Sequence, residues 1–415
     1  MKILLVHQNF PGQFRRLAVA LKERGHTVLA LTEPSNERPS PVAVARYRAA
    51  DHGQLGQGVH RAFAEAADRG LRAALGARVL RDKHGFVPDV ILGHSGWGET
   101  LYLKEVFPDT PLIVYSEMMF RARGLDVGFD PEFADEPLAA AIRMQSRQAH
   151  LMQALVLADR GVTPTRFQAD SHPALLRAKL TVLHDGIDTE TLAPDLAARL
   201  TLADGTALAA GDEVLTYVSR ALEPYRGFHI FLRALPAILK ARPGARVVVV
   251  GREGVSYGPK PKDAESWKAR MLAELGDRLD LSRVHFTGQI PYGDYVRLLQ
   301  ISRAHVYLTY PFVLSWSLME AMSAGCAIIA SDTAPVREVI THGHNGLLVD
   351  FFDIAALVDA TVAALADPGA ARARRQAARA TIRARYRIED CLPRWITLLE
   401  SRGQIAEEWP ALDRS

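Results

Sequence analysis

Cysteine is scarce in this sequence, and so are long runs of apolar residues. The 415 residues include only two cysteines, Cys326 and Cys391, far apart along the chain. A disulfide framework is therefore excluded as the organising principle, and a reducing compartment is expected. No stretch approaches the roughly 18 consecutive apolar residues of a spanning helix, and the apolar run at residues 3–6 is too short for a secretion signal. We therefore expect a cytoplasmic location.

Charge of one sign is not in excess either, because 50 lysines and arginines are balanced by 47 aspartates and glutamates. The net charge of +3 gives no electrostatic footprint for nucleic acid, which is not expected as a partner. The G-x-G-x-x-G, P-loop, H-E-x-x-H and paired C-x-x-C motifs are absent. D-x-D is also absent, so a metal-bound diphosphate is not expected and basic side chains would have to neutralise that group. We expect no metal and no cofactor.

The chain alternates short apolar runs with amphipathic helical patterns, in two successive sets. In the helical pattern at residues 13–24, for example, the apolar side chains recur on one face and a glycine follows. The runs predict strands at residues 2–7, 27–32, 90–92, 111–115 and 180–183, and then at 214–218, 247–250, 284–286, 305–308 and 327–330.

Continuous apolar strands separated by helices are typical of parallel sheets that are covered on both faces. We predict an α/β protein with two doubly wound, Rossmann-like domains, at residues 1–190 and 191–390. Residues 391–415 are expected to form a C-terminal helix that crosses back to the first domain. Ligands bind outside the carboxyl ends of such strands, so two facing sheets would form a cleft lined by the loops that follow the strands.

The first candidate segment starts at the end of the strand at residues 214–218. Arg220 is expected to follow this strand directly, and Arg226 with Gly227 opens the next helix. Two guanidinium groups, with the free N–H groups of a helix start, suit a diphosphate. The structural alternative, two surface arginines on a loop, is about equally consistent with this segment alone.

The second segment, residues 310–325, holds a loop and the start of a helix. Its candidate donor-binding residues are Ser315, Trp316, Ser317, Leu318 and Glu320. The Glu320 carboxylate could accept two hydrogen bonds from a ribose diol. Ser317-x-x-Glu320 is also a capping box, in which Glu320 would only bind back to the helix start. The spacing alone slightly favours the capping role, and the two roles are compatible.

Two further segments follow strands in the first half. Residues 9–12 place backbone N–H groups at a helix start, which makes Gly12 a candidate donor-binding residue, although a plain turn is equally consistent. His94 and Ser95 follow the strand at residues 90–92. Ser95 is reminiscent of the nucleophile of a hydrolase, but Trp97 stands where the G-x-S-x-G motif requires glycine. His94, and Glu117 after the strand at 111–115, are candidates for the acceptor side.

A basic segment lies near the C-terminus. Residues 371–387 contain no acidic residue and seven arginines: Arg372, Arg374, Arg375, Arg379, Arg383, Arg385 and Arg387. A solvated helix face is the usual explanation. A basic helix can also attract anionic lipid, which would allow a peripheral contact with the inner face of a membrane.

Taken together, these segments give the C-terminal half a recognisable pattern. It resembles the retaining glycosyltransferases of family 4, in the two-Rossmann GT-B class. The matching segments, in the family's order, are Arg220 with Arg226-Gly227, then residues 284–288, 320–325, 338–340 and 345–349. Weaker similarities in the N-terminal half are residues 25–28 and the joint at residues 184–188.

The resemblance implies a nucleotide-diphospho-sugar donor, transfer with retained configuration, and no metal. It places Arg220 and Arg226 on the diphosphate, with Arg226 where the family has lysine, and Glu320 on the ribose. The acceptor would be a glycan, a lipid-linked sugar or another hydroxyl compound. Glu117 is carried over as a catalytic candidate only by its place after a strand.

One position departs from the family pattern. The first glutamate of the family's E-x7-E motif, which contacts the donor sugar, is matched here by Phe312. This difference puts the donor's identity in question and keeps two alternatives open. One is an inactive nucleotide-sugar-binding partner protein, and the other is a sugar-nucleotide epimerase on the same fold.

Overall fold

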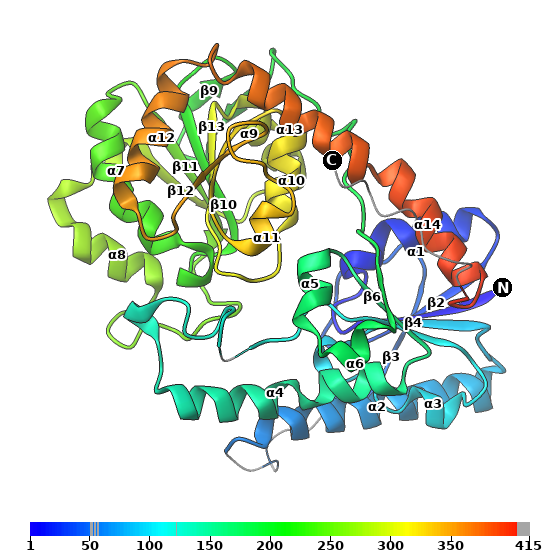
Figure 1. Ribbon diagram of the computed structural model, residues 1–415. Helices are drawn as coiled ribbons and strands as arrows, with labels where there is room; N and C mark the ends of the chain where they lie inside the picture. Colours follow the sequence, from blue (N-terminus) through cyan, green and yellow to red (C-terminus); the bar gives the residue numbers. More distant parts are fainter. Residues whose placement is uncertain (50–52, 54, 56–57, 122, 405–415) are drawn as a thin grey trace. The chain divides into compact units, whose positions relative to one another are not determined.

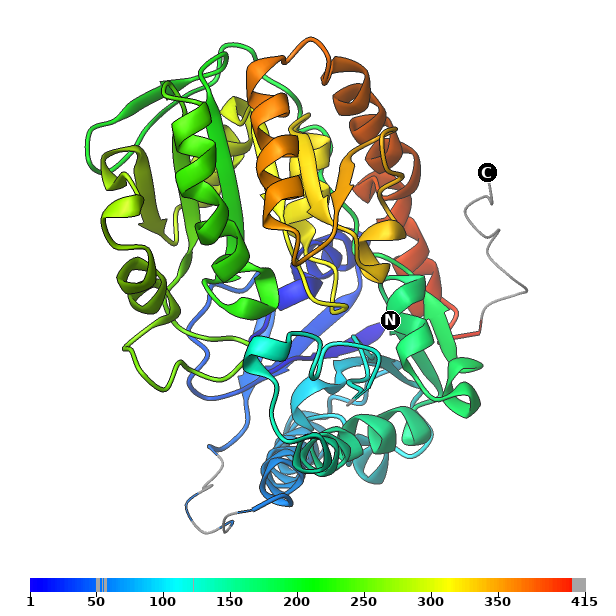
Figure 2. The same cartoon turned by 60° about the vertical axis from the view of Figure 1, so that its left-hand side comes forward.

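A computed structural model describes residues 1–49, 53, 55, 58–121 and 123–404, which form two compact α/β units. Unit 1 comprises Met1–Gly186 and resumes at Glu389, while unit 2 comprises Ile187–Ile388. In each unit, helices cover both faces of a parallel sheet (Figures 1 and 2). The predicted fold class of two doubly wound domains is confirmed. Of the predicted C-terminal segment 391–415, residues 405–415 lie outside the described residues.

Unit 1 is built on a seven-stranded sheet with the order β3-β2-β1-β4-β5-β6-β7. Every neighbouring pair in it is parallel. The strands are β1 (Lys2–Val6), β2 (Thr27–Thr32), β3 (Ala43–Arg46), β4 (Val90–His94), β5 (Leu112–Tyr115), β6 (Arg160–Thr163) and β7 (Leu180–Val182).

Alternate side chains of β1 enter two different cores, because successive residues of a strand point to opposite faces. Ile3 and Leu5 pack with α1 (Arg15–Glu23) and α14 (Ile388–Glu400). Leu4 packs on the other face with α2 (Arg61–His84). The second face also carries α3 (Leu103–Val106) and α4 (Pro137–Leu157), and the short helices α5 (Arg166–Ser171) and α6 (Ala174–Arg177) flank β6 and β7.

Unit 2 is built on a six-stranded parallel sheet with the order β12-β11-β10-β13-β14-β15. Its strands are β10 (Val214–Ala221), β11 (Arg246–Arg252), β12 (Val284–Gly288), β13 (Ala304–Tyr307), β14 (Ala327–Ser331) and β15 (Leu347–Val349). A separate antiparallel hairpin joins β8 (Arg199–Thr201) to β9 (Ala207–Ala209).

Helices from distant parts of unit 2 share the faces of this sheet. On one face the buried side chains come from α9 (Tyr292–Ile301), α10 (Trp316–Ser323), α11 (Ala334–Arg337) and α13 (Arg372–Arg385). The remaining helices are α7 (Phe228–Ala241), α8 (Trp267–Leu275) and α12 (Ile354–Ala366), of which α7 and α12 pack on each other.

The strand order reverses once in each sheet, between β1 and β4 in unit 1 and between β10 and β13 in unit 2. In open α/β sheets the loops on either side of such a switch point diverge, and ligands bind outside the carboxyl ends of the two strands. The loops after β1, β4, β10 and β13 are therefore the places where each unit is built to hold a ligand.

All ten predicted strands are present, and the differences are local. Arg220 does not follow a strand but lies within β10, which continues past Val218 with a register shift before Ala221. The sequence pattern did not predict β3, β6, β15 or the β8–β9 hairpin, which are short or alternate polar and apolar residues. Among the described residues, no helix has the length and apolar character to cross a membrane.

Candidate functional site

The switch point of unit 2 is closed by one arginine that joins two loops. Arg226 lies in the loop after β10, and its Nη1 donates to three oxygens of the β13 strand and loop. The acceptors are the Tyr307 hydroxyl at 3.1 Å, Thr309 Oγ1 at 3.0 Å and the Val313 carbonyl at 2.9 Å. Both loops are thereby held together at the place where the topology predicts a ligand.

The charge of Arg226 is buried without a counter-ion. Only 6% of the residue is exposed, and within the described residues it forms no ion pair. Burial works against the charged form, but the phenol groups of Tyr307 and Tyr257 outweigh it and raise the pKa of the guanidinium. A buried cation that keeps its charge and has no carboxylate beside it is a site for an anionic ligand.

Two neighbours set the shape of this region. Gly227 has φ of +66°, and a Cβ there would lie 2.3 Å from the Leu308 side chain, so only glycine allows the β10 loop to pass the β13 loop so closely. Glu223 is fully buried and accepts hydrogen bonds from the backbone N–H groups of residues 256, 257 and 258. This carboxylate ties the loop after β11 to the same place.

Arg220 differs from Arg226 in being exposed. Its side chain lies in the last part of β10, and in the described part of the chain it has no hydrogen bond or ion pair. An exposed guanidinium at the carboxyl end of this strand is available to a ligand. Arg220 and Arg226 thus combine one accessible cation with one built into the loops.

The start of α10 corrects one expectation. Ser315, not Ser317, is the N-cap, and its Oγ accepts from the Ser317 N–H at 3.3 Å. Glu320 therefore lies in the second turn of the helix, too far along for the predicted capping box. The Leu318 N–H reaches the Ser315 carbonyl, also at 3.3 Å. Both bonds are longer than typical N–H···O bonds, so an anion can compete for these donors.

Glu320 is instead held by a residue that no sequence pattern indicated. The hydroxyl of Tyr295, on α9, donates to Glu320 Oε2 at 2.5 Å. Trp316, at the first helical position, is 41% exposed, whereas Leu318 is fully buried and can offer only its backbone. No sequence signal marked Tyr295, because its contact with α10 depends on how two helices pack.

Phe312, which stands where the family has a glutamate, lies in an aromatic cluster. Its ring centroid is 4.6 Å from that of Tyr257 and 5.4 Å from that of Tyr225. The Arg226 guanidinium lies 5.5 Å from the Phe312 and Tyr257 ring centroids, within the range of cation–π attraction. Phe312 therefore contributes to the burial of Arg226 rather than opening the loop.

In unit 1, the loops after β1 and β4 meet through two histidines at its switch point. The His7 and His94 ring centroids are 5.1 Å apart. His7 accepts from the Asn9 N–H and is hydrogen-bonded to Gln13 Oε1, and burial lowers its pKa to about 4. Gly12 lies over this ring, since a Cβ there would come within 2.5 Å of His7 Nε2. His7 was missed, although it follows the first predicted strand directly.

His94 is the stronger chemical candidate of the two because one of its nitrogens has no partner among the described residues. Nδ1 accepts from the Gly96 N–H at 3.0 Å, so the neutral ring carries its proton on Nε2. Burial lowers the pKa of His94 well below its usual value, and Nε2 has no hydrogen-bond partner among the described residues. Ser95 is fully buried and donates to the Tyr115 carbonyl, which argues against its use as a nucleophile.

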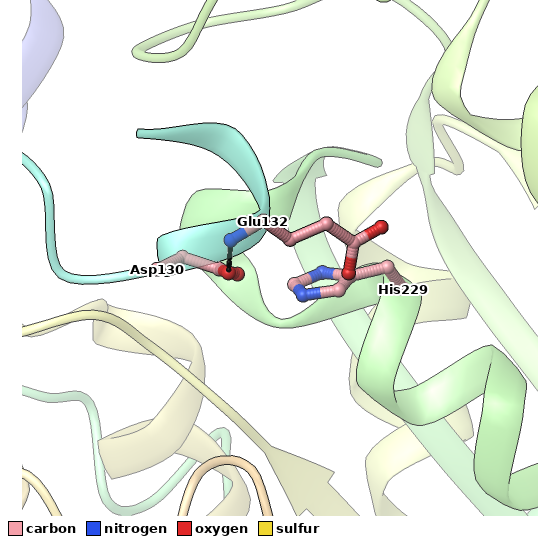
Figure 3. Close-up of side chains that lie close together, drawn as sticks. All are labelled: Asp130, Glu132 and His229. Carbon is pink, nitrogen blue, oxygen red and sulfur yellow. Dashed lines mark hydrogen bonds between the residues drawn. The ribbon is translucent and has the colours of Figure 1, made fainter. Parts of the chain in front are cut away.

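Glu117 follows β5, as expected, and its backbone is firmly held. The Glu117 carbonyl accepts from Thr163 Oγ1 and Gln168 Nε2. Farther along, the Asp130 carboxylate accepts from the Glu132 N–H at 3.0 Å and caps the short helix at Pro131–Phe133 (Figure 3). Glu117 is thus held through its backbone to β6 and α5 of unit 1.

The basic segment of α13 is partly used inside unit 2. Arg375 and Arg379 donate to the carbonyls of Gly325 and Ser323, at the carboxyl end of α10, where cations are favoured. Arg385 donates to the Glu338 carbonyl. These arginines stabilise the helix that carries the candidate donor site.

Comparison with known proteins identifies the family. Residues 24–192 match the "Glycosyl transferase family 4 group", and residues 202–381 match the "Glycosyl transferases group 1". The chain is a family 4 glycosyltransferase of the GT-B class. Glycogen synthase of Mycobacterium tuberculosis is 24% identical to this glycosyltransferase over 406 residues, which cover 91% of the chain and 89% of the relative.

Solved structures show the same fold as this glycosyltransferase. Sucrose-phosphate synthase from Thermosynechococcus elongatus superposes with a TM-score of 0.70 at 19% identity, covering 97% of this chain and 98% of that one. Anabaena HepE, solved with UDP and glucose, has a TM-score of 0.64 at 17% identity and covers 97% and 100%.

Proposed function

We propose that this glycosyltransferase moves a sugar from a nucleotide-diphospho-sugar to an acceptor hydroxyl, with retention of configuration and without a metal. The observation that carries the proposal is the buried guanidinium of Arg226, which lacks an ion-pair partner among the described residues at the switch point of unit 2. A diphosphate supplies the missing negative charge there.

The residues of unit 2 divide the donor between them. Arg220 and Arg226 bind the diphosphate together with the Ser315 side chain and the N–H groups at the start of α10, from Trp316 to Leu318. Glu320 binds the ribose hydroxyls. The two guanidinium groups stabilise the negative charge that develops on the departing diphosphate.

The chemistry needs no dedicated protein base. The acceptor oxygen forms a bond to the anomeric carbon as the bond from that carbon to the diphosphate oxygen breaks, and the proton of the acceptor hydroxyl passes to the departing diphosphate. His94 and Glu117, with Gly12 shaping the neighbouring loop, are the candidates for orienting substrate from unit 1. His94 Nε2–H is a donor that no described residue uses.

The inactive-partner alternative has one observation in its favour. Phe312 is 1% exposed and packed among aromatic rings, so the position that would carry a sugar-binding carboxylate offers no polar group. An inactive partner protein would bind the nucleotide and transfer nothing. An epimerase on this fold would change the donor in the absence of any acceptor, so product analysis separates the three.

The first test is metal-free calorimetry of UDP, GDP and ADP with the wild type and Glu320→Ala. We expect one nucleotide to bind tightly and the variant to weaken it by about tenfold or more, the effect of losing hydrogen bonds to a charged group. Asp359→Ala, which removes an exposed carboxylate on α12, serves as the control. Failure of all three nucleotides to bind would refute the proposed function.

A further inference from the structure

The hydrogen bond between Tyr295 and Glu320 connects α9, which packs on the sheet of unit 2, to the proposed ribose site on α10. The two residues come from α9 and α10, which lie before and after β13 in the chain. Their oxygens are 2.5 Å apart, which is short for a hydrogen bond and typical of a neutral hydroxyl that donates to a carboxylate.

The phenol remains a donor over the whole neutral range. Burial, and then the negative charge of Glu320, raise the pKa of Tyr295 well above its ordinary value. Tyr295 also packs against the core that contains Leu299 and Leu318, so its ring is fixed by apolar contacts on the same face of the sheet. A rigid donor on a core helix therefore determines where one oxygen of Glu320 lies.

This matters because a glutamate side chain has three rotatable bonds and samples several rotamers unless a neighbour holds it. A carboxylate that must accept hydrogen bonds from two adjacent hydroxyls loses affinity when it has to be ordered at the moment of binding. An internal donor to one oxygen removes part of that cost before the ligand arrives.

We infer that Tyr295 is a positioning residue for nucleotide recognition: its hydroxyl holds Glu320 in the rotamer that receives a ribose diol. The inference rests on the proposed function and specifies which class of nucleotide the site prefers. This site discriminates ribonucleotides from 2′-deoxyribonucleotides, and the discrimination depends on a tyrosine that does not touch the ligand.

The experiment measures the dissociation constants of the nucleoside diphosphate that binds best and of its 2′-deoxy form, by metal-free calorimetry. The proteins are the full-length wild type, Tyr295→Phe, Glu320→Gln and the double variant. Tyr292→Phe is the matched control, because it removes the same atom from the neighbouring tyrosine of α9, whose side chain is 51% exposed. Circular dichroism and thermal unfolding verify that each variant folds.

We expect the wild type to bind the ribonucleotide about tenfold to a hundredfold more tightly than the 2′-deoxy form. The deoxynucleotide lacks the 2′-hydroxyl, so the charged Glu320 carboxylate loses one hydrogen bond. Glu320→Gln should reduce this preference to about twofold. Tyr295→Phe should reduce it by about threefold to tenfold and leave the affinity for the deoxynucleotide unchanged. The double variant should match Glu320→Gln, because the tyrosine acts only through the glutamate. Tyr292→Phe should behave as the wild type.

Three results would overturn the inference. If Tyr295→Phe kept the full ribose preference while Glu320→Gln lost it, the tyrosine would not position the glutamate, and the proposed function would stand. If Tyr295→Phe weakened both nucleotides equally, its role would be structural. If no ribonucleotide bound the wild type, the proposed function itself would fail and this inference with it.

Discussion

Glu99 is a buried carboxyl group whose ionisation should destabilise unit 1 at neutral pH. It is fully buried, and the Tyr47 hydroxyl donates to its Oε1 at 3.1 Å. The nearest cation, Arg69, lies 4.0 Å away from that oxygen, and Oε2 has no partner among the described residues. Burial above all, with a smaller contribution from Glu33, raises the pKa of Glu99 to about 7, despite the opposing effects of Arg69 and Tyr47.

The sign of the effect follows from where the proton is lost. In the unfolded chain a glutamate releases its proton near pH 4.5, whereas folded Glu99 holds it to about pH 7. The folded state therefore binds more protons between these values, and the free energy of unfolding falls as pH rises through this window. The stabilising contribution is fully present below pH 4.5 and lost above pH 7, and the difference is about 3 kcal/mol.

Glu99→Gln should make unit 1 more stable than the wild type by about 3 kcal/mol at pH 8 and leave it nearly unchanged at pH 4, because glutamine resembles the protonated acid. Since the chain has two units, the measurement should be local: hydrogen exchange of the β1 and β4 amides in urea at several pH values. Glu105→Gln, an exposed change on α3, should have no such effect. A Glu99→Gln protein that is no more stable than the wild type at pH 8 would refute the reasoning.

Three other changes test the site and its supports. Arg220→Ala should lower kcat/KM of sugar transfer by about a hundredfold or more, because an exposed cation on the diphosphate is lost, and near-normal turnover would contradict this role. Gly12→Ala should destabilise unit 1 by more than Gly25→Ala in urea unfolding, since both residues have positive φ but only Gly12 would bring a Cβ against His7. Burial lowers the pKa of His305 to about 3, so the stability that the neutral ring contributes is present above pH 6.5 and lost as pH falls toward 3. The unfolding free energy of the wild type should therefore fall more steeply with acid than that of His305→Asn. Equal slopes for the two proteins would exclude His305 as the cause.

Sequence patterns were sufficient to predict the features of the fold that depend on residues close together along the chain. The continuous valines of residues 247–250 predicted a buried parallel strand, and β11 occupies that place. The order of strands and helices predicted two doubly wound units, since a short apolar strand followed by an amphipathic helix can close only as a crossover. The same order directed attention to Arg226 and His94, which the structure places at the two switch points.

Only the tertiary structure decided what those side chains face. Arg220 is exposed although it lies within β10, and the burial of Arg226 follows from rings contributed by the loops after β11 and β13. The sequence favoured a capping role for Glu320, but the helix begins two residues earlier and Tyr295 occupies one of its oxygens. Such contacts join residues 25 or more positions apart, so they depend on how helices pack on a sheet, and local sequence patterns carry no record of that packing.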